Sequence, residues 1–373
     1  MNTTTPASPQ DAWAAFCDAL KAAGQNIIEA PSTPSTPDNA LDKAEGYRYL
    51  ARLTRAGLES FLESSDSQVP EFRRPVHETI KMGMDNPDNI YLSAPINGKQ
   101  RYRIWGQRNT VHYLGFGTQA GGYGKTGNLE TTGYLEAQDM EIAADGSFEI
   151  IVSSERPEGV RNWLPARADS RMVQVRQTHM LRKTERAAEV HIELLDTPAQ
   201  PRHFSPERLA PALQGAAQFV AGTAHVFKQW VEGMRQHPNT LPRFDPDVAF
   251  KAGGDPHIAY YHSWFDLADD EALLISFTPP ECQHWNFQLA NYWLESLDYR
   301  YWPVHLNKGT AHYEADGSVR IIVSKTAPST PQANWLDTCA RNHGSMCLRW
   351  IKAATQPQPQ CQVIKLAALD QAQ

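Results

Sequence analysis

Residues 283–293 combine a side chain that could do acid–base chemistry, His284, with several amides that could bind a substrate. His284, Asn286 and Gln288 occupy every second position of this stretch, and large apolar residues fill the positions between them. Such alternation is the period of a β-strand, so the three polar side chains share one face, which projects either to solvent or into a cavity between modules. Because an imidazole exchanges protons near neutral pH, His284 is a candidate general acid or base.

Polar and aromatic residues continue directly after this strand, with Asn291, Trp293 and Tyr299 among them. Amides mixed with amphipathic aromatic rings are typical of small-molecule pockets. We therefore predict that Asn286, Asn291 and Trp293 bind substrate and that Tyr299 acts in catalysis as a hydrogen-bond donor.

Residues 257–267 indicate a second strand that carries a possible catalytic group. Tyr260, His262 and Trp264 share one of its faces, and His262 is a second candidate acid or base. His257 lies five positions before His262 and points to the opposite face, and the sequence has no HxH or HxxxH spacing. We therefore expect neither a metal ion nor a cofactor.

The five cysteines do not form a recognisable functional set. They are odd in number and widely spaced, with no CxxC or CxH cluster. A chain of this length does not need disulfides to fold, so we interpret them as unpaired thiols that pack as small apolar residues.

Residues 115–127 are the richest glycine segment of the chain. They contain neither GxxxxGK[ST] nor GxGxxG, so a phosphate-binding loop is not indicated. The composition favours a wide hairpin or a mobile lid that closes over a bound molecule. Gln119 and Tyr123 are the residues of this segment that we expect to face a ligand.

Residues 85–91 combine aspartates and asparagines before the first predicted strand. This spacing is compatible with a calcium loop, but the glutamate and glycine of an EF-hand are missing. The same residue types form turns through their own side-chain hydrogen bonds, and a structural turn is the preferred interpretation.

Composition limits the classes of partner. The chain has 373 residues, a formal net charge of −7 and 41% hydrophobic residues. It has no basic cluster, which argues against nucleic acid, and no run of about 20 apolar residues that would span a membrane. The polar N-terminus is unlike a signal peptide, so we expect a cytoplasmic protein that binds a small hydrophobic or aromatic ligand, with a homodimer as its candidate assembly.

An internal repeat defines the expected architecture. Ala-Asp-Gly-Ser followed by Ile-Ile-Val-Ser occurs twice, with Asp145 and Asp316 171 positions apart, and Asn-Trp-Leu begins again at Asn162 and Asn334, 172 positions apart. Asp-Gly is a tight-turn signal, and the apolar run is the strand that leaves it. We expect Trp163 and Trp335, which follow these asparagines, to be buried plugs.

The predicted fold class is α+β, with two antiparallel β-sandwich modules of the jelly-roll type. Apolar residues at helical spacing predict helices over residues 11–30, 39–63 and 206–236, and Asn39 or Asp42 could cap the second. The predicted boundaries are a helical region (1–84), a first sandwich (85–200), a helical linker (201–250), and a second sandwich with the C-terminal tail (251–373).

These motifs, together with a late arginine, resemble those of the bacterial domain-of-unknown-function family twelve-fourteen. Its C-terminal module is similar to residues 255–352, where Asp316, Asn334 and Arg349 stand at the corresponding places. The first copy, with Arg176, is a more distant version. Asn334-Trp-Leu-Asp-Thr with Gly344 is similar to a subgroup associated with catabolism of steroid-like or aromatic compounds. The resemblance implies a β-sandwich fold and carries no established catalytic residues.

The leading functional hypothesis is a cofactor-independent lyase, isomerase or hydrolase that acts on a small hydrophobic oxygenated compound. His284 or His262 would be its acid–base group, with Tyr299 or Tyr123 as hydrogen-bond donor. A non-catalytic module that binds a ligand or carbohydrate is the alternative. A third reading is an interaction protein whose aromatic residues fill the interface between modules. Both copies' late arginines are expected to have structural roles.

Overall fold

The structure is a computed structural model that describes residues 8–29, 37, 39–195, 201, 203–329 and 332–369. The chain divides into two compact units, and each contains one β-sandwich. The first unit comprises Met1–Ile80, Ile90–His179 and Glu185–Val226, and the second comprises Lys81–Asn89, Met180–Thr184 and Phe227–Gln373. The second unit therefore includes two short segments that precede its main part by many residues.

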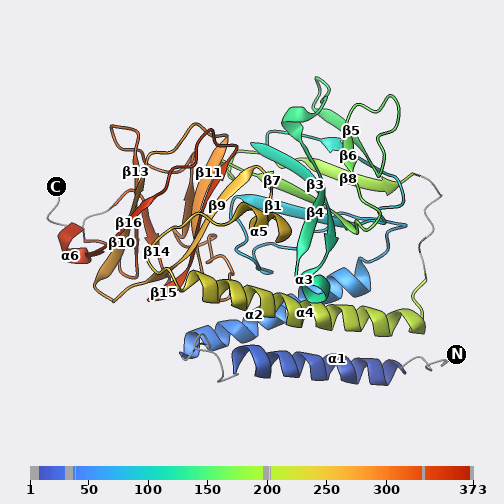
Figure 1. The fold of residues 1–373 in the computed structure, drawn as a ribbon, viewed down its shortest axis with the longest axis horizontal. Helices are drawn as coiled ribbons and strands as arrows, with labels where there is room; N and C mark the ends of the chain where they lie inside the picture. Colours follow the sequence, from blue (N-terminus) through green and yellow to red (C-terminus); the bar gives the residue numbers. More distant parts are fainter. Residues whose placement is uncertain are drawn as a thin grey trace. The chain divides into compact units, whose positions relative to one another are not determined.

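The three predicted helices are present (Figure 1). They are α1 (Pro9–Ala23), α2 (Ala40–Leu58) and α4 (Pro206–Met234). Asn39 caps α2, because its side-chain oxygen accepts a hydrogen bond from the Asp42 backbone. The first two helices each end in a π-helical turn, Gly24–Ile28 and Glu59–Glu63. Of residues 30–38, which link the first two helical segments, only Pro37 is described.

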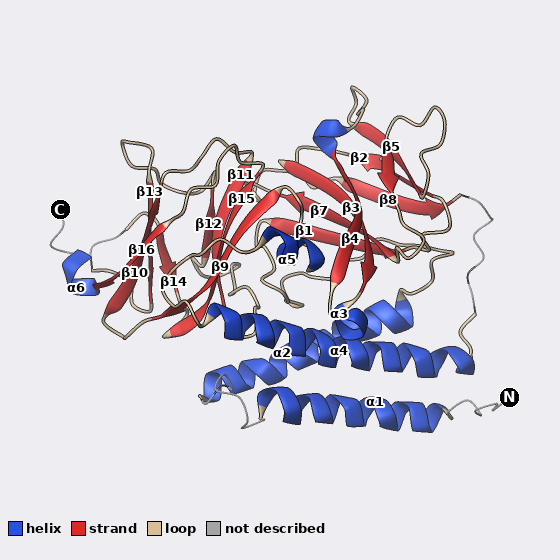
Figure 2. Cartoon of the chain, viewed as in Figure 1, coloured by secondary structure: helices blue, strands red, loops and turns tan. Residues whose placement is uncertain are grey.

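The first sandwich consists of two four-stranded sheets (Figure 2). Their strand orders are β1-β7-β3-β4 and β6-β5-β2-β8. Apolar side chains from both sheets, among them Ile104, Phe116 and Val175, form its core. The strands are β1 (Asn89–Pro95), β2 (Tyr102–Gln107), β3 (Tyr113–Gly121), β4 (Leu129–Glu136), β5 (Ser147–Ser153), β6 (Trp163–Pro165), β7 (Met172–Thr178) and β8 (Glu189–Leu194).

The second sandwich has the sheet orders β12-β11-β15-β9 and β14-β13-β10-β16. Its core includes Trp285, Phe287 and Trp350, which are fully buried. Two short helices that were not predicted, α5 (Pro246–Lys251) and α6 (Leu366–Leu369), flank the strands in sequence. The strands are β9 (Ile258–Asp266), β10 (Glu271–Phe277), β11 (His284–Ala290), β12 (His305–Asn307), β13 (Val319–Ser324), β14 (Trp335–Asp337), β15 (His343–Ile351) and β16 (Gln360–Lys365).

The strand orders confirm the duplication. When β1 to β8 are matched in sequence with β9 to β16, both sheet orders coincide. The parallel pair β5–β6 also has its counterpart in β13–β14. Each sandwich also contains a final strand, β8 or β16, that the sequence motifs did not single out.

The repeated motifs make the same hydrogen bonds in both copies. The Asn162 side chain donates to the carbonyls of Glu141 and Glu149 and accepts from the Glu141 amide. Asn334 makes the equivalent three bonds to His312 and Arg320. These asparagines therefore connect the Asp-Gly hairpin to the next strand.

The two tryptophans were expected to be buried plugs, and this prediction is wrong. Trp163 and Trp335 are only half-buried, and each donates its indole N–H to a serine of the neighbouring strand, Ser153 or Ser324. Strand alternation points the following residue, Leu164 or Leu336, into the core instead.

The glycine segment 115–127 was predicted to form a wide hairpin or a mobile lid, and it forms a hairpin. Its first seven residues belong to β3, and a four-residue helix, α3 (Tyr123–Thr126), makes the tip before β4 begins. Gly124 packs so closely on α4 that a Cβ atom there would collide with the Gln218 carbonyl. Gly121 has φ +83°, a conformation that favours glycine.

All five cysteines are free thiols, as predicted. Among the described residues, every helix is too short or too polar to span a membrane.

Candidate functional site

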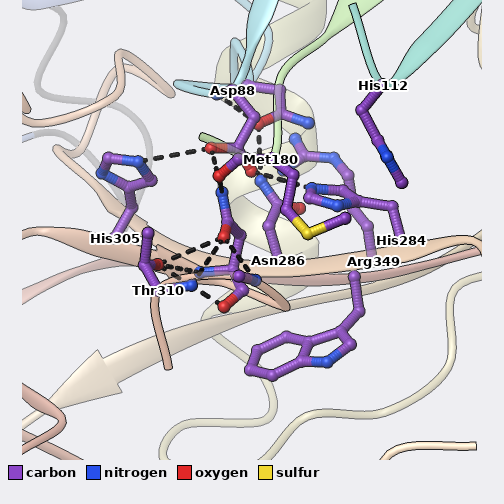
Figure 3. Close-up of polar contacts among 12 residues, drawn as sticks. Asp88, His112, Met180, His284, Asn286, His305, Thr310 and Arg349 are labelled. Atoms are coloured by element: carbon purple, nitrogen blue, oxygen red, sulfur yellow. Dashed lines mark hydrogen bonds and ion pairs between the residues drawn. The ribbon is translucent and has the colours of Figure 1, made fainter. Parts of the chain in front are cut away.

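The polar face of β11 is buried in the structure. His284, Asn286 and Gln288 are each 0% exposed, so the interpretation as a solvent-exposed face is wrong. Within the same unit, Asp85, Asn86 and Asp88 of the segment 81–89 exchange hydrogen bonds with this face, and Figure 3 shows those of Asp88. A polar sheet face can be buried only when its donors and acceptors find partners.

Asp88 is the centre of the resulting network. Its carboxylate accepts hydrogen bonds from His284 Nε2 at 3.1 Å and from Asn307 Nδ2 at 2.8 Å. His305 Nε2 lies 3.4 Å from the same carboxylate (Figure 3). One buried carboxylate thus holds two imidazole rings from adjacent strands, β11 and β12.

The electrostatics keep this carboxylate ionised. Burial alone would raise the pKa of Asp88, but the hydrogen bonds from His284 and His305 outweigh it and hold that pKa well below its ordinary value. Because an ionised carboxylate can only accept hydrogen bonds, each ring turns an Nε2–H toward it. The side chain of His305 is 23% exposed and that of His284 is 0% exposed. His305 is therefore the imidazole that a small molecule can reach.

Hydrogen bonds to Met84 and Asp85 hold the segment that carries Asp88. Asp85 accepts from the Ser296 amide and hydroxyl, and burial raises the pKa of Asp85. Gln288 donates to the Asp85 carbonyl, and Arg349 donates to Gln288 Oε1 at 2.5 Å and to the Met84 carbonyl at 2.6 Å. Arg349 thus pairs with one side-chain amide oxygen and with one backbone carbonyl that lies 265 positions earlier in the chain.

Tyr299 lies beside this cluster. Its ring packs edge-on against His305 with centroids 5.9 Å apart, and Lys81 Nζ lies 4.7 Å from the Tyr299 centroid. Lys81 also donates to the carbonyls of Ser296 and Leu297. Of the three predicted catalytic residues, the structure therefore places two, His284 and Tyr299, beside Asp88 and His305.

His262 occupies another part of the same sheet face. The pairing register places His262, Cys347 and Gln288 in one row across β9, β15 and β11. Within the described residues, both ring nitrogens of His262 are buried without a hydrogen-bond partner, as is the Ser345 hydroxyl. Burial, with Arg349 nearby, lowers the pKa of His262 to about 3, so the ring is neutral.

The remaining predicted binding residues separate into two groups. Asn291 and Trp293 are buried in the turn after β11, where the Asn291 side chain bonds to the Trp293 amide and to Glu295. These contacts give Asn291 a turn-forming role. Gln119 and Tyr123 belong to the β3–β4 hairpin of the first unit, and Gln119 is buried.

Sequence reasoning did not identify Asp88, His305 or Asn307 as functional candidates. The run 85–91 does form turn contacts, since Asn86 accepts from the Asp88 amide. The sequence signal for Asp88 was the density of acidic and amide residues directly before a strand. Only the fold shows that this run lies on β11. His305 and Asn307 alternate within β12, a strand too short to give a clear pattern.

Among the described residues, no group of three or more histidine, cysteine, aspartate or glutamate side chains is arranged to hold a metal ion. The two imidazoles point their Nε2 atoms at the carboxylate itself.

The fold and the site together define a duplicated β-sandwich protein in which the second module carries a buried carboxylate between two histidines. A family model described as a protein of unknown function (DUF1214) matches residues 124–178 and 272–355, one segment in each module. The chain belongs to this family. The match confirms the resemblance that the turn, asparagine and arginine motifs indicated.

Two solved structures are similar to this chain. An uncharacterized protein from Burkholderia cenocepacia is 45% identical with a TM-score of 0.91, and the match covers 96% of this chain and 98% of that one. The VPA0106 protein from Vibrio parahaemolyticus is 13% identical with a TM-score of 0.50, covering 86% and 98%, and shows similarity of fold alone. No curated protein matches the chain.

Proposed function

We propose that the protein is an enzyme that moves protons on a small hydrophobic oxygenated compound, as a lyase, isomerase or hydrolase. The observation that carries the proposal is the ionised Asp88 carboxylate held between two imidazoles. A carboxylate that fixes the tautomer of a histidine is a recurring device for general acid–base catalysis. Buried ion pairs also occur in purely structural roles, so the proposal needs a chemical test.

In this proposal His305 is the general acid–base residue. Its Nε2–H faces Asp88, so Nδ1 is the atom that would accept or return a proton, and the partial exposure of its side chain gives access. His284, which is fully buried, holds the opposite side of the carboxylate and acts as a positioning residue. Tyr299 supports the His305 ring through its edge-on contact.

The substrate class rests on two supports. The neutral ring of His262 and the Ser345 hydroxyl offer buried polar atoms that a carbonyl or hydroxyl oxygen could complete, as could an ordered water. The resemblance to a subgroup associated with catabolism of steroid-like or aromatic compounds favours a hydrophobic oxygenated molecule.

A turnover screen tests the proposal. The wild-type protein is incubated with ketones, enones, lactones and esters that carry aromatic or alicyclic rings, and products are followed by liquid chromatography and mass spectrometry. For any compound that is converted, His305→Gln should slow turnover at least about 100-fold. The control is His312→Gln, whose side chain is exposed and whose structural bonds are made by its backbone. Unchanged turnover in His305→Gln would refute the assignment.

Binding without catalysis is the second candidate function. It is favoured by His262, which is neutral and therefore suited to hydrogen bonding rather than to proton transfer at neutral pH. Saturable binding of a compound in the screen without conversion, weakened by His262→Phe, would support this alternative.

A further inference from the structure

A cavity of about 250 Å³ opens in the second unit beside β9. Its wall includes residues before β9, the β9 residues Ile258 to Tyr260, the end of β15 and the segment that follows β15. Protein pockets that bind small molecules are about 300–1,000 Å³, so this cavity suits a ligand at the small end of that range. It is a different region from the Asp88 network, since the two have no residue in common.

The charged residues of the cavity are all basic. Arg243 and Lys352 line it, together with His257, and no lining residue is acidic. The chain as a whole has a net charge of −7, so a wall whose two fixed charges are both positive is contrary to the average composition. Such a concentration of positive charge favours an anionic ligand.

The rest of the wall is aromatic and well supported. Phe244 and Tyr260 line the cavity, and both are half-buried, so each remains partly accessible. The Tyr260 hydroxyl accepts a hydrogen bond from the Asp255 amide, and the Phe244 ring packs on His262 with centroids 5.0 Å apart. Aromatic side chains fixed in this way provide a flat apolar surface for a planar ligand.

We propose that this cavity binds a small aromatic carboxylate. The carboxylate accepts hydrogen bonds from Arg243, for which a guanidinium is well suited, and the ring of the ligand lies against the aromatic wall. This inference goes beyond the proposed function, because binding here requires neither His305 nor Asp88.

Arg243 is the residue on which the proposal can be tested without loss of folding. It is exposed, and its guanidinium has no hydrogen-bond partner among the described residues. Its fixed contact is made by the backbone, which forms a bridge with Tyr261. Replacing the side chain therefore removes a charge from the cavity without breaking an internal bond.

The probe is 4-fluorobenzoate, and its binding to the full chain is measured by ¹⁹F NMR titration and by calorimetry. 4-Fluorobenzamide has the same shape without the charge and should bind at least about tenfold more weakly. Arg243→Gln should weaken benzoate binding about tenfold or more and leave benzamide binding unchanged. The matched control is Arg320→Gln, an exposed arginine outside the cavity, which should bind both compounds as the wild type does.

Salt adds an independent readout, because raising ionic strength should weaken benzoate binding and not benzamide binding. Equal affinity of the two compounds would overturn the proposal by showing an apolar pocket without charge selection. Benzoate binding that Arg243→Gln does not change would also overturn it. Absence of benzoate binding at millimolar concentration would overturn it as well.

Discussion

The sheet that contains β11 and its counterpart in the first module, which contains β3, differ in the side chains of one face. In the second module, Asn286 and Gln288 project from β11. At the matching places of β3, opposite β7, the first module has Gly115 and Gly117. The late arginines keep their register, since Arg176 pairs with Gly115 and Arg349 pairs with Asn286. The duplication therefore retained the framework and changed the side chains that the framework presents.

This difference separates structural motifs from candidate functional groups. The features that occur twice, such as Asn162 and Asn334, make identical backbone contacts in both copies and therefore hold the fold. The features that occur once, such as the Asp88 network, exist only in the second module. Chemistry should be sought among the features that are not repeated, and the predictions below test that division.

The largest effect is expected from removing the carboxylate of the unrepeated network. Asp88→Ala leaves the buried His284 ring, the partly exposed His305 ring and the Asn307 amide without their acceptor, and it should lower the free energy of unfolding by about 3–5 kcal/mol. Asp269→Ala, which removes an exposed partner of Lys325, should change it little. Urea unfolding of the intact chain measures both. A loss for Asp88→Ala as small as that for Asp269→Ala would show that the network is not a stability element.

The same carboxylate should make stability depend on acid. Because its native pKa lies below its unfolded value near 3.9, its contribution is present above that pH and is lost as pH falls through the native pKa. Asp88→Ala should therefore lose less stability on acidification than the wild type does.

The repeated asparagines should have equal effects. Asn162→Ala and Asn334→Ala each remove three part-buried hydrogen bonds between a side chain and backbone groups, so each should cost about 2–3 kcal/mol. Hydrogen exchange followed by mass spectrometry can assign the loss to the module that carries the change. If one variant were much less stable than the other, the two copies of the motif would not be equivalent.

His262 should give the second module a further response to pH. Its native pKa of about 3 lies below the unfolded value near 6.5, so the unfolded chain takes up a proton first as pH falls. The wild type should therefore lose about 2 kcal/mol between pH 6.5 and pH 5 that His262→Phe does not lose. Denaturant unfolding at the two pH values measures the difference. Parallel pH dependence in the two proteins would mean that the ring is charged or solvated in the native state.

The sequence predicted much of the fold because the decisive signals are local. Helical spacing located the long helices, and the repeat located two sandwiches with β13 and β5 directly after Asp-Gly turns. Strands whose position depends on tertiary pairing were missed, such as the edge strand β16, which pairs with β10 and is mostly exposed, with polar residues at half of its positions.

The candidate site was predicted only in part for the same reason. Alternation identified His284 and placed it on a polar face, and the structure confirms that face. Its partner Asp88 lies 196 positions earlier in the chain, and no local pattern connects the two. Exposure of the polar face to solvent was one expectation, because the sequence does not reveal that residues 81–89 cross this face.

The smallest effect concerns the glycines that replaced polar residues in the first module. At Gly117 a Cβ atom would lie 3.5 Å from the Gly133 carbonyl oxygen, which is ordinary contact, so no steric need for glycine exists there. Gly117→Ala should change the free energy of unfolding by no more than about 0.5–1 kcal/mol, with stabilisation favoured because alanine restricts the unfolded chain. At Gly133 a Cβ atom would collide with the Pro165 carbonyl, so Gly133→Ala should be clearly destabilising. Thermal unfolding compares the two variants. A neutral Gly117→Ala would indicate that the glycine face of β3 arose by drift after duplication. A loss of stability as large as that of Gly133→Ala would show that the first module needs this glycine and that the two faces diverged under constraint.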